Sequence, residues 1–214
     1  MEIILAENHG FCYGVKRAVE MADEAANSEG KSYTLGPIIH NPQVVGRLES
    51  KGVSPIQEVA DIDEGTMIIR SHGVGPAIYA EAEEKGLHIL DATADAIKSR
   101  GLNKVALLGT KFTMSDNFYR DGLIVRGITP IVPNESAQNE IHRIIFDELC
   151  VGKFLPQSKA FYLDTIEFLR KQGAEGVILG CTEIGLLVNQ SDFSLPFFDT
   201  AKLHSQMAAE FVLK

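Results

Sequence analysis

Short apolar segments recur along this sequence, and each is followed by residues whose apolar positions repeat at helical spacing. After the segment Ile3–Ala6, for example, Val15, Ala18, Val19 and Ala22 share one helical face. Strands that are apolar at every position belong to parallel sheets with helices on both faces. The sequence therefore predicts an α/β protein built as two doubly wound parallel-sheet lobes of the flavodoxin or Rossmann type, with a cleft between them. The apolar segments lie at residues 3–6, 33–35, 67–69, 105–108 and 177–179.

The charge of the chain restricts its partners. The 214 residues carry a formal net charge of -9, which disfavours nucleic acids and anionic membranes because both attract basic surfaces. The sequence has no window of about 20 apolar residues, and its first residues lack the basic region of a secretory signal. We therefore expect a cytoplasmic protein that binds a small-molecule anion or an amino acid, and the sequence leaves the oligomeric state open.

Three cysteines are candidates for thiol chemistry: Cys12, Cys150 and Cys181. They are far apart and form no C-x-x-C pair, so neither a disulfide framework nor a zinc site is expected. Cys181 lies between a strand end and a helix start, where the helix N-terminus would stabilise its thiolate as a base or nucleophile. The alternative for Cys181 is a small buried side chain. Cys150 is predicted to pack on an amphipathic helix beside Ile145 and Leu149.

Loops at the carboxyl ends of the strands are the places where a parallel sheet binds ligands. Two of these loops carry His40 and His72, each before a proline-containing helix start, and such a histidine can bind an anion or transfer a proton at neutral pH. A hydrogen-bonded structural histidine is the alternative at each position. The other loops of this kind lie at residues 8–12, 109–113 and 180–183. Neither a complete dinucleotide fingerprint nor a Walker motif occurs.

Motifs of one enzyme family occupy the first half of the chain, at Asn8–Val15, Gly36–Pro42, Ile69–Val74 and Leu90–Thr93. By these motifs residues 1–93 resemble the first domain of the LytB family, the iron-sulfur reductases of hydroxymethylbutenyl diphosphate. The resemblance implies that Cys12 is one ligand of a [4Fe–4S] cluster. It also implies that His40 and His72 contact the substrate diphosphate, and we place Ser71 with them as a substrate-binding candidate.

The LytB resemblance fails at one essential position. Where the family continues Asp-Ala-Thr with a second cluster cysteine, this chain has Ala94. The family's third ligand and its catalytic glutamate have no counterpart further along the chain. Because a cluster of this type is held by several thiolates, we expect no iron-sulfur cluster, no other metal or cofactor, and no reductase activity.

A second set of motifs lies at Asp91–Lys98, Leu107–Met114, Gly180–Ile184 and Phe198–Thr200. These motifs resemble the second half of the cofactor-independent aspartate/glutamate racemases. The resemblance implies that Cys181 is one of two catalytic thiols, with Thr182 beside it in the catalytic centre. It further implies that the substrate carboxylate is held by Thr110, Thr113 and Thr182.

Racemisation without a cofactor needs two bases on opposite faces of the substrate carbon. The spacing of the racemase family places its first thiol at Ser71–His72 of this chain, where no cysteine occurs. His72 and Cys12 are therefore the candidate opposing bases. Gly185 stands where the family usually has proline, a departure that leaves the thiol of Cys181 in place.

The two resemblances meet at Asp91–Thr93. We expect a LytB-like lobe over 1–93 and a racemase-like lobe over 94–214, with the last helix, about 201–214, packed on its own lobe or back on the first. The predicted function is that of an engineered chimera which folds without a complete active site of either parent. Two alternatives stay open: a racemase or one-base α-proton exchange enzyme that uses Cys181, and a phosphate- or diphosphate-binding module that uses His40 and His72. The sequence favours inactivity over activity, and racemase chemistry over iron-sulfur reduction.

Overall fold

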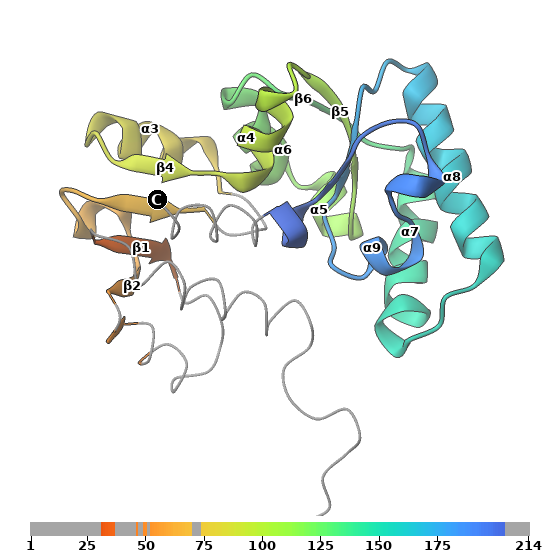
Figure 1. Cartoon of the computed structure of the whole chain (residues 1–214), viewed down its shortest axis with the longest axis horizontal. Coiled ribbons are helices and arrows are strands. Elements are labelled where there is room, and N and C mark those ends of the chain that lie inside the picture. Colours follow the sequence, from red (N-terminus) through yellow and green to blue (C-terminus); the bar gives the residue numbers. More distant parts are fainter. Residues whose placement is uncertain (1–30, 37–45, 47–48, 51, 70–73, 204–214) are drawn as a thin grey trace, which may run out of the picture.

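The strands form two four-stranded parallel sheets in the computed structural model, which describes residues 31–36, 46, 49–50, 52–69 and 74–203. The sheets have the orders β2-β1-β3-β4 and β6-β5-β7-β8, so each lobe adds strands on both sides of its first described strand (Figure 1). The predicted class, an α/β protein with two doubly wound parallel sheets, is confirmed. The predicted strand 3–6 and the helix predicted directly after it lie outside the described residues, and the cleft stays a prediction.

The first sheet consists of β1 (Ser32–Leu35), β2 (Val53–Ile56), β3 (Thr66–Ile68) and β4 (His88–Leu90). Its helix α3 (Pro76–Glu84) starts with proline at the first helical turn, as the sequence predicts. Tyr79 and Ala82 of α3 are buried in one apolar cluster with Met67 of β3. Burial against the strands therefore fixes α3 on the first lobe.

The second sheet is covered on both faces. Its central strand β5 (Lys104–Leu108) sends Ala106 and Leu108 into one apolar cluster, and Val105 and Leu107 into another. The first cluster contains buried residues of α7 and α8, and the second contains buried residues of α4 and α6. This arrangement explains why β5 is apolar at successive positions. The other strands are β6 (Thr129–Ile131), β7 (Val177–Leu179) and β8 (Phe197–Asp199).

The helices of the second lobe are α4 (Ala92–Ser99), α5 (Lys111–Ser115), α6 (Asn117–Val125), α7 (Glu135–Asp147), α8 (Pro156–Lys171) and α9 (Ile184–Leu187). One turn of 3-10 helix, η2 (Leu149–Val151), comes directly after α7. The last helix starts at Thr200, and Leu203 packs on the second lobe, whereas residues after 203 lie outside the described part. Among the residues that the structure describes, no helix is both long and apolar enough to cross a bilayer.

Cys150 does not have the position that the sequence predicts. The helix α7 ends at Asp147, and Cys150 lies in the turn η2 with an exposed side chain, while its neighbour Leu149 is buried. The prediction that Cys150 packs in the core is therefore wrong. The physical reason is that the chain leaves the helical path before Cys150 and turns through Gly152, which has a left-handed backbone conformation.

The chain passes from the first sheet to the helices of the second lobe through a single strand-to-helix unit, β4 followed by α4. After β4, the carboxylate of Asp91 caps α4 by accepting a 3.0 Å hydrogen bond from the Ala94 N–H. Further along the chain, α6 packs against α3 of the first lobe, and a Cβ atom added to Gly122 would lie 2.5 Å from the Val74 carbonyl oxygen. The two lobes thus approach each other closely along α3 and α6.

Candidate functional site

Two loops with candidate site residues lie side by side at the carboxyl edge of the second sheet. Strands β5 and β7 are neighbours, and the Gly180 N–H donates a 2.7 Å hydrogen bond to the Leu108 carbonyl at the point where both strands end. A Cβ atom added to Gly180 would lie 3.3 Å from Cγ2 of Thr113. The loop after β5 and the loop after β7 are therefore in direct proximity, as expected for adjacent parallel strands.

The loop after β5 presents two threonine hydroxyls. Thr110 caps α5, because its Oγ1 accepts a 3.2 Å hydrogen bond from the Thr113 N–H. The hydroxyl oxygens of Thr110 and Thr113 lie 3.1 Å apart and share a further hydrogen bond. Both side chains are half-buried. Two neighbouring hydroxyls on a capped turn form a fixed group that can donate to a carboxylate.

The loop after β7 presents the thiol of Cys181 to a carboxylate. The Cys181 Sγ–H donates to Oε2 of Glu183 at 2.9 Å, and the Thr182 hydroxyl donates to the same oxygen at 2.7 Å. Cys181 is half-buried and packs against the cluster between the sheet and α7 and α8. The arrangement is that of a thiol with an adjacent proton acceptor.

The electrostatics of this loop favour the thiol form of Cys181. Burial, followed by the hydrogen bond to Glu183 and its negative charge, raises the pKa of Cys181 to about 12. The prediction that a helix N-terminus stabilises the thiolate is therefore wrong in direction. The helix after Cys181 is only the four residues of α9, and the carboxylate of Glu183 lies at its start.

Glu183 is itself held as a carboxylate. Burial by itself would raise the pKa of Glu183, but the hydrogen bonds from Cys181, from Thr182 and from its own backbone N–H together lower it. Glu183 lies in the sequence motif Gly180–Ile184, but no role is predicted for it from the sequence. A carboxylate two residues after a candidate thiol is a sequence signal that could have indicated this interaction. Partial burial and then the negative charge of Glu183 raise the pKa of the Cys150 thiol as well.

The remaining candidates of the first lobe are not placed by the structure. Cys12, His40, Ser71 and His72 lie outside the described residues, so the opposing base and the diphosphate site stay predictions. His142 is described and has a structural role, since its Nδ1 accepts the Lys111 N–H at 3.2 Å at the start of α5.

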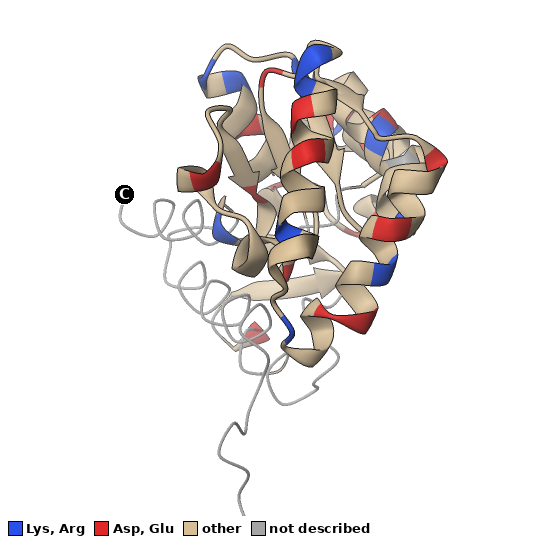
Figure 2. Cartoon of the chain, turned by 90° about the vertical axis from the view of Figure 1, so that its right-hand side faces the viewer, with Lys and Arg blue, Asp and Glu red and all other residues tan. Residues whose placement is uncertain are grey.

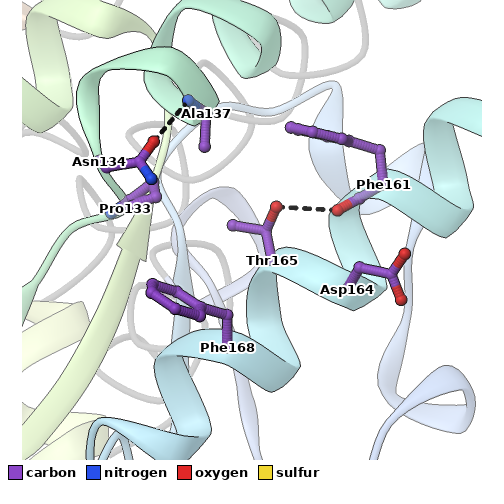
Figure 3. Close-up of a pocket in the computed structure, with 7 residues that line it drawn as sticks. All are labelled: Pro133, Asn134, Ala137, Phe161, Asp164, Thr165 and Phe168. Carbon is purple, nitrogen blue, oxygen red and sulfur yellow. Dashed lines mark hydrogen bonds between the residues drawn. The ribbon is translucent and has the colours of Figure 1, made fainter.

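A surface hollow of about 210 Å³ lies between α7 and α8, and Cys181 is not among the residues that line it (Figure 3). Two of its polar side chains have local partners, because Asn134 caps α7 through the Ala137 N–H and the Thr165 hydroxyl donates to the Phe161 carbonyl. The hollow is lined by Pro133, Asn134, Ala137, Phe161, Asp164, Thr165 and Phe168.

Charged residues of both signs lie on the side of the molecule shown in Figure 2. Some ion pairs form within one helix, such as that of Arg170 with Glu167 at 2.7 Å.

The first half of the chain is similar to known reductases. The sequence model of the family described as LytB protein matches residues 3–106. The 4-hydroxy-3-methylbut-2-enyl diphosphate reductase of Geotalea uraniireducens is 55% identical over 98 residues, which are 46% of this chain and 35% of that protein. The same enzyme of Geobacter metallireducens is 56% identical over 98 residues, with the same coverage. The chain thus spans about a third of the length of these curated relatives.

The chain is also similar to racemases, and these matches are not confined to its second half. A crystal structure of a putative Asp/Glu racemase from Yersinia pestis has a TM-score of 0.61 and 31% identity, covering 94% of this chain and 76% of that one. PH1733, an aspartate racemase homologue from Pyrococcus horikoshii OT3, has a TM-score of 0.62 and 32% identity, covering 80% and 72%. Both predicted resemblances are confirmed, and the Asp/Glu/hydantoin racemase model matches residues 78–208, overlapping the LytB match over 78–106. By this match and these two structures, the chain belongs to the Asp/Glu/hydantoin racemase family.

Proposed function

We propose that the protein is a hybrid in which equivalent α/β units of two families were exchanged at Asp91–Thr93, and that it has one acid–base thiol, Cys181. The overlap of the two family matches over 78–106 supports this proposal, because a join inside that range satisfies both families locally. In this hybrid the racemase half carries the chemistry. The function that we propose is one-base proton exchange at the α-carbon of an amino acid such as aspartate or glutamate.

Reductase chemistry is left out of the proposal because the residues do not fit an iron-sulfur cluster. The position after Asp-Ala-Thr is Ala94, whose methyl group cannot bind iron and is fully buried within the second lobe. Its N–H is also occupied by the cap to Asp91. Reconstitution with iron and sulfide under anaerobic conditions is expected to leave the protein colourless, and a stable cluster spectrum would contradict this part of the proposal.

One observation carries the proposed function: the Cys181 thiol is 2.9 Å from the Glu183 carboxylate in a loop that adjoins Thr113, whose hydroxyl is paired with that of Thr110. We propose that these hydroxyls hold the α-carboxylate of the substrate. The thiolate of Cys181 then removes the α-proton, so that the C–H bond breaks, the S–H bond forms and the electron pair stays on the substrate. After the sulfur has exchanged its proton with solvent, it returns a proton to the same face of the carbon.

Return of the proton to the same face preserves the configuration of the substrate. Racemisation requires a second base on the opposite face, and its candidates, His72 and Cys12, lie outside the described residues. Because the pKa of Cys181 is about 12, only a small fraction of this thiol is ionised near neutral pH. The exchange should therefore be slow and should accelerate as the pH rises.

Deuterium exchange tests this function directly. L-aspartate and L-glutamate are incubated with the protein in D2O near pH 9, and loss of the α-proton signal is followed by NMR. The wild-type protein and Cys150→Ser are expected to exchange the proton with retention of configuration, whereas Cys181→Ala is not. Absence of exchange in the wild-type protein would reject the activity and leave an inactive hybrid, and formation of the D-enantiomer would show that an opposing base is present.

A further inference from the structure

The imidazole of His142, on α7, accepts a hydrogen bond from the backbone at the start of α5. The N–H of Lys111, the first residue of α5, donates to Nδ1 of His142 at 3.2 Å. A backbone N–H can only donate, so the ring nitrogen that it meets must offer a lone pair. His142 therefore makes this hydrogen bond only while its imidazole is neutral, because both nitrogens of a protonated imidazole are donors.

This hydrogen bond lies directly beside the hydroxyl pair of Thr110 and Thr113. Thr110 is the residue before Lys111, and its Oγ1 caps α5 by accepting the Thr113 N–H at 3.2 Å. The two hydroxyl oxygens lie 3.1 Å apart. The helix α5 has only five residues, and a helix this short depends on contacts with its surroundings for its stability. The hydrogen bond to His142 thus holds the backbone at the residue next to Thr110.

Other contacts hold α5 against α7 around the same imidazole. The ring of Phe112 meets the imidazole edge-on with the ring centroids 5.8 Å apart, and the ring of Phe146 lies on it with the centroids 4.7 Å apart. The Lys111 ammonium donates to Oδ1 of Asn139 at 2.7 Å. Of these contacts and the hydrogen bond to Nδ1, the hydrogen bond is the one that requires a neutral imidazole. Protonation of His142 therefore removes the backbone hydrogen bond and leaves the packing of the rings in place.

The charged groups on this side of α7 do not favour an added proton. Lys111 is the cation of α5 that reaches α7, and its ammonium lies 3.5 Å from the carboxylate of Glu135. Glu140 and Arg143 pair with each other at 2.7 Å and line a hollow on the side of α7 that faces α8. A protonated imidazole would therefore add positive charge beside a lysine whose carboxylate is already paired. The other titratable groups at the ends of these helices and in η2 are Asp116, Asp147, Glu148 and Cys150.

We propose that His142 is a pH-sensitive positioning residue for the hydroxyl pair of Thr110 and Thr113. The neutral imidazole holds the start of α5 through the Lys111 N–H, and protonation releases it, so that the pair binds a carboxylate less tightly in mildly acidic solution. This inference rests on the proposed role of the two hydroxyls in holding the substrate carboxylate. The charge of a histidine ordinarily changes between about pH 5 and about pH 8, and the release of α5 falls in that range.

The test combines amide NMR with the binding of L-aspartate, whose carboxylates stay ionised from about pH 8 down to about pH 5. His142→Asn keeps an acceptor close to the position of Nδ1 but takes up no proton. His142→Phe keeps an aromatic ring in the contacts on both sides but removes the acceptor. His88→Asn, at an exposed histidine of β4, is the matched control. The amide signals of Lys111 and Thr113 report the hydrogen bond to the imidazole and the cap of α5 without any substrate.

In the wild-type protein and in His88→Asn, the Lys111 amide proton should move to lower chemical shift as the pH falls. L-aspartate should bind about threefold to tenfold more weakly at the low end of the range, which corresponds to one neutral hydrogen bond. His142→Asn should keep both properties constant with pH, and His142→Phe should show the low-pH values throughout.

A Lys111 signal that titrates in the same way in the wild-type protein and in His142→Asn would overturn this role of His142, whether or not L-aspartate binds. Absence of L-aspartate binding at every pH, together with a Lys111 signal that titrates only when His142 is present, would reject the proposed function and retain the control of α5 by His142.

Discussion

The phenol of Tyr79 donates a 2.5 Å hydrogen bond to the buried carboxylate of Asp91, the residue that caps α4. Tyr79 belongs to the helix on the first sheet, and Asp91 begins the first helix after the join. Burial and then the charge of Asp91 raise the pKa of Tyr79, so the phenol stays a donor over the ordinary pH range. One carboxylate therefore links the last helix of the first lobe to the first helix of the second lobe.

Removing the Tyr79 hydroxyl should weaken this link. Tyr79→Phe leaves one oxygen of the buried Asp91 carboxylate without its donor, and a hydrogen bond to a charged group contributes about 1.5–3 kcal/mol. We expect the free energy of unfolding in urea to fall by an amount in that range. Tyr33→Phe, at a half-buried tyrosine of β1, is the control for loss of a tyrosine hydroxyl elsewhere. Equal stability of Tyr79→Phe and the wild-type protein would show that the bond does not hold the lobes together.

The contact between α6 and the first lobe predicts a strong effect of a single methyl group. Gly122→Ala places its Cβ atom 2.5 Å from the Val74 carbonyl oxygen, so the backbone at one of the two positions must move. Overpacking of this kind costs about 1–3 kcal/mol, which exceeds the gain of up to about 1 kcal/mol from replacing glycine by alanine in a helix.

Gly46→Ala is the matched control for this change. Gly46 is also helical, but a Cβ atom added there meets no other atom within 4 Å. Thermal unfolding should show a lower midpoint for Gly122→Ala and an equal or higher midpoint for Gly46→Ala. If both variants melted at or above the wild-type midpoint, the close approach of α6 to Val74 would be disproved.

Strands buried on both faces could be predicted from the sequence, whereas an edge strand could not. The continuous apolar runs at 105–108 and 177–179 correspond to β5 and β7 because helices cover both faces of these strands. The sequence of β2 contains Ser54 and Pro55, which interrupt the apolar pattern. Proline lacks an N–H group, and β2 tolerates it because it lies at the edge of the described sheet.

In the site, the proximity of two loops could be predicted from the sheet topology, whereas the charge state of the thiol could not be predicted from the sequence. The proximity of Thr113 to Gly180 follows from the rule that loops of adjacent parallel strands meet at one edge. The charge state of Cys181 follows from its burial and from the orientation of the Glu183 side chain, neither of which is encoded in the spacing of the motif. The exposed position of Cys150 was likewise hidden, because the apolar pattern of α7 continues to Leu149, beyond the end of the helix.

The raised pKa of Cys181 predicts that removal of the neighbouring charge will make the thiol more reactive. In Glu183→Gln the amide can still accept the S–H, but the negative charge that opposes ionisation is lost. The pKa of Cys181 should fall from about 12 and stay above the ordinary value of a thiol, because burial is its first cause and is unchanged. Each unit of this fall corresponds to a thiolate fraction, and hence an alkylation rate at fixed pH, that is about tenfold higher.

The pH dependence of alkylation checks the sign of this change. In a protein whose only cysteine is Cys181, obtained by Cys12→Ser and Cys150→Ser, alkylation by iodoacetamide is measured from about pH 8 to about pH 11, and Glu183→Gln should be alkylated faster at each pH. Glu84→Gln, at an exposed glutamate of α3, serves as the control and should leave the profile in place. An alkylation rate for Glu183→Gln that is unchanged or lower at each pH would mean that the charge of Glu183 does not hold Cys181 in its thiol form.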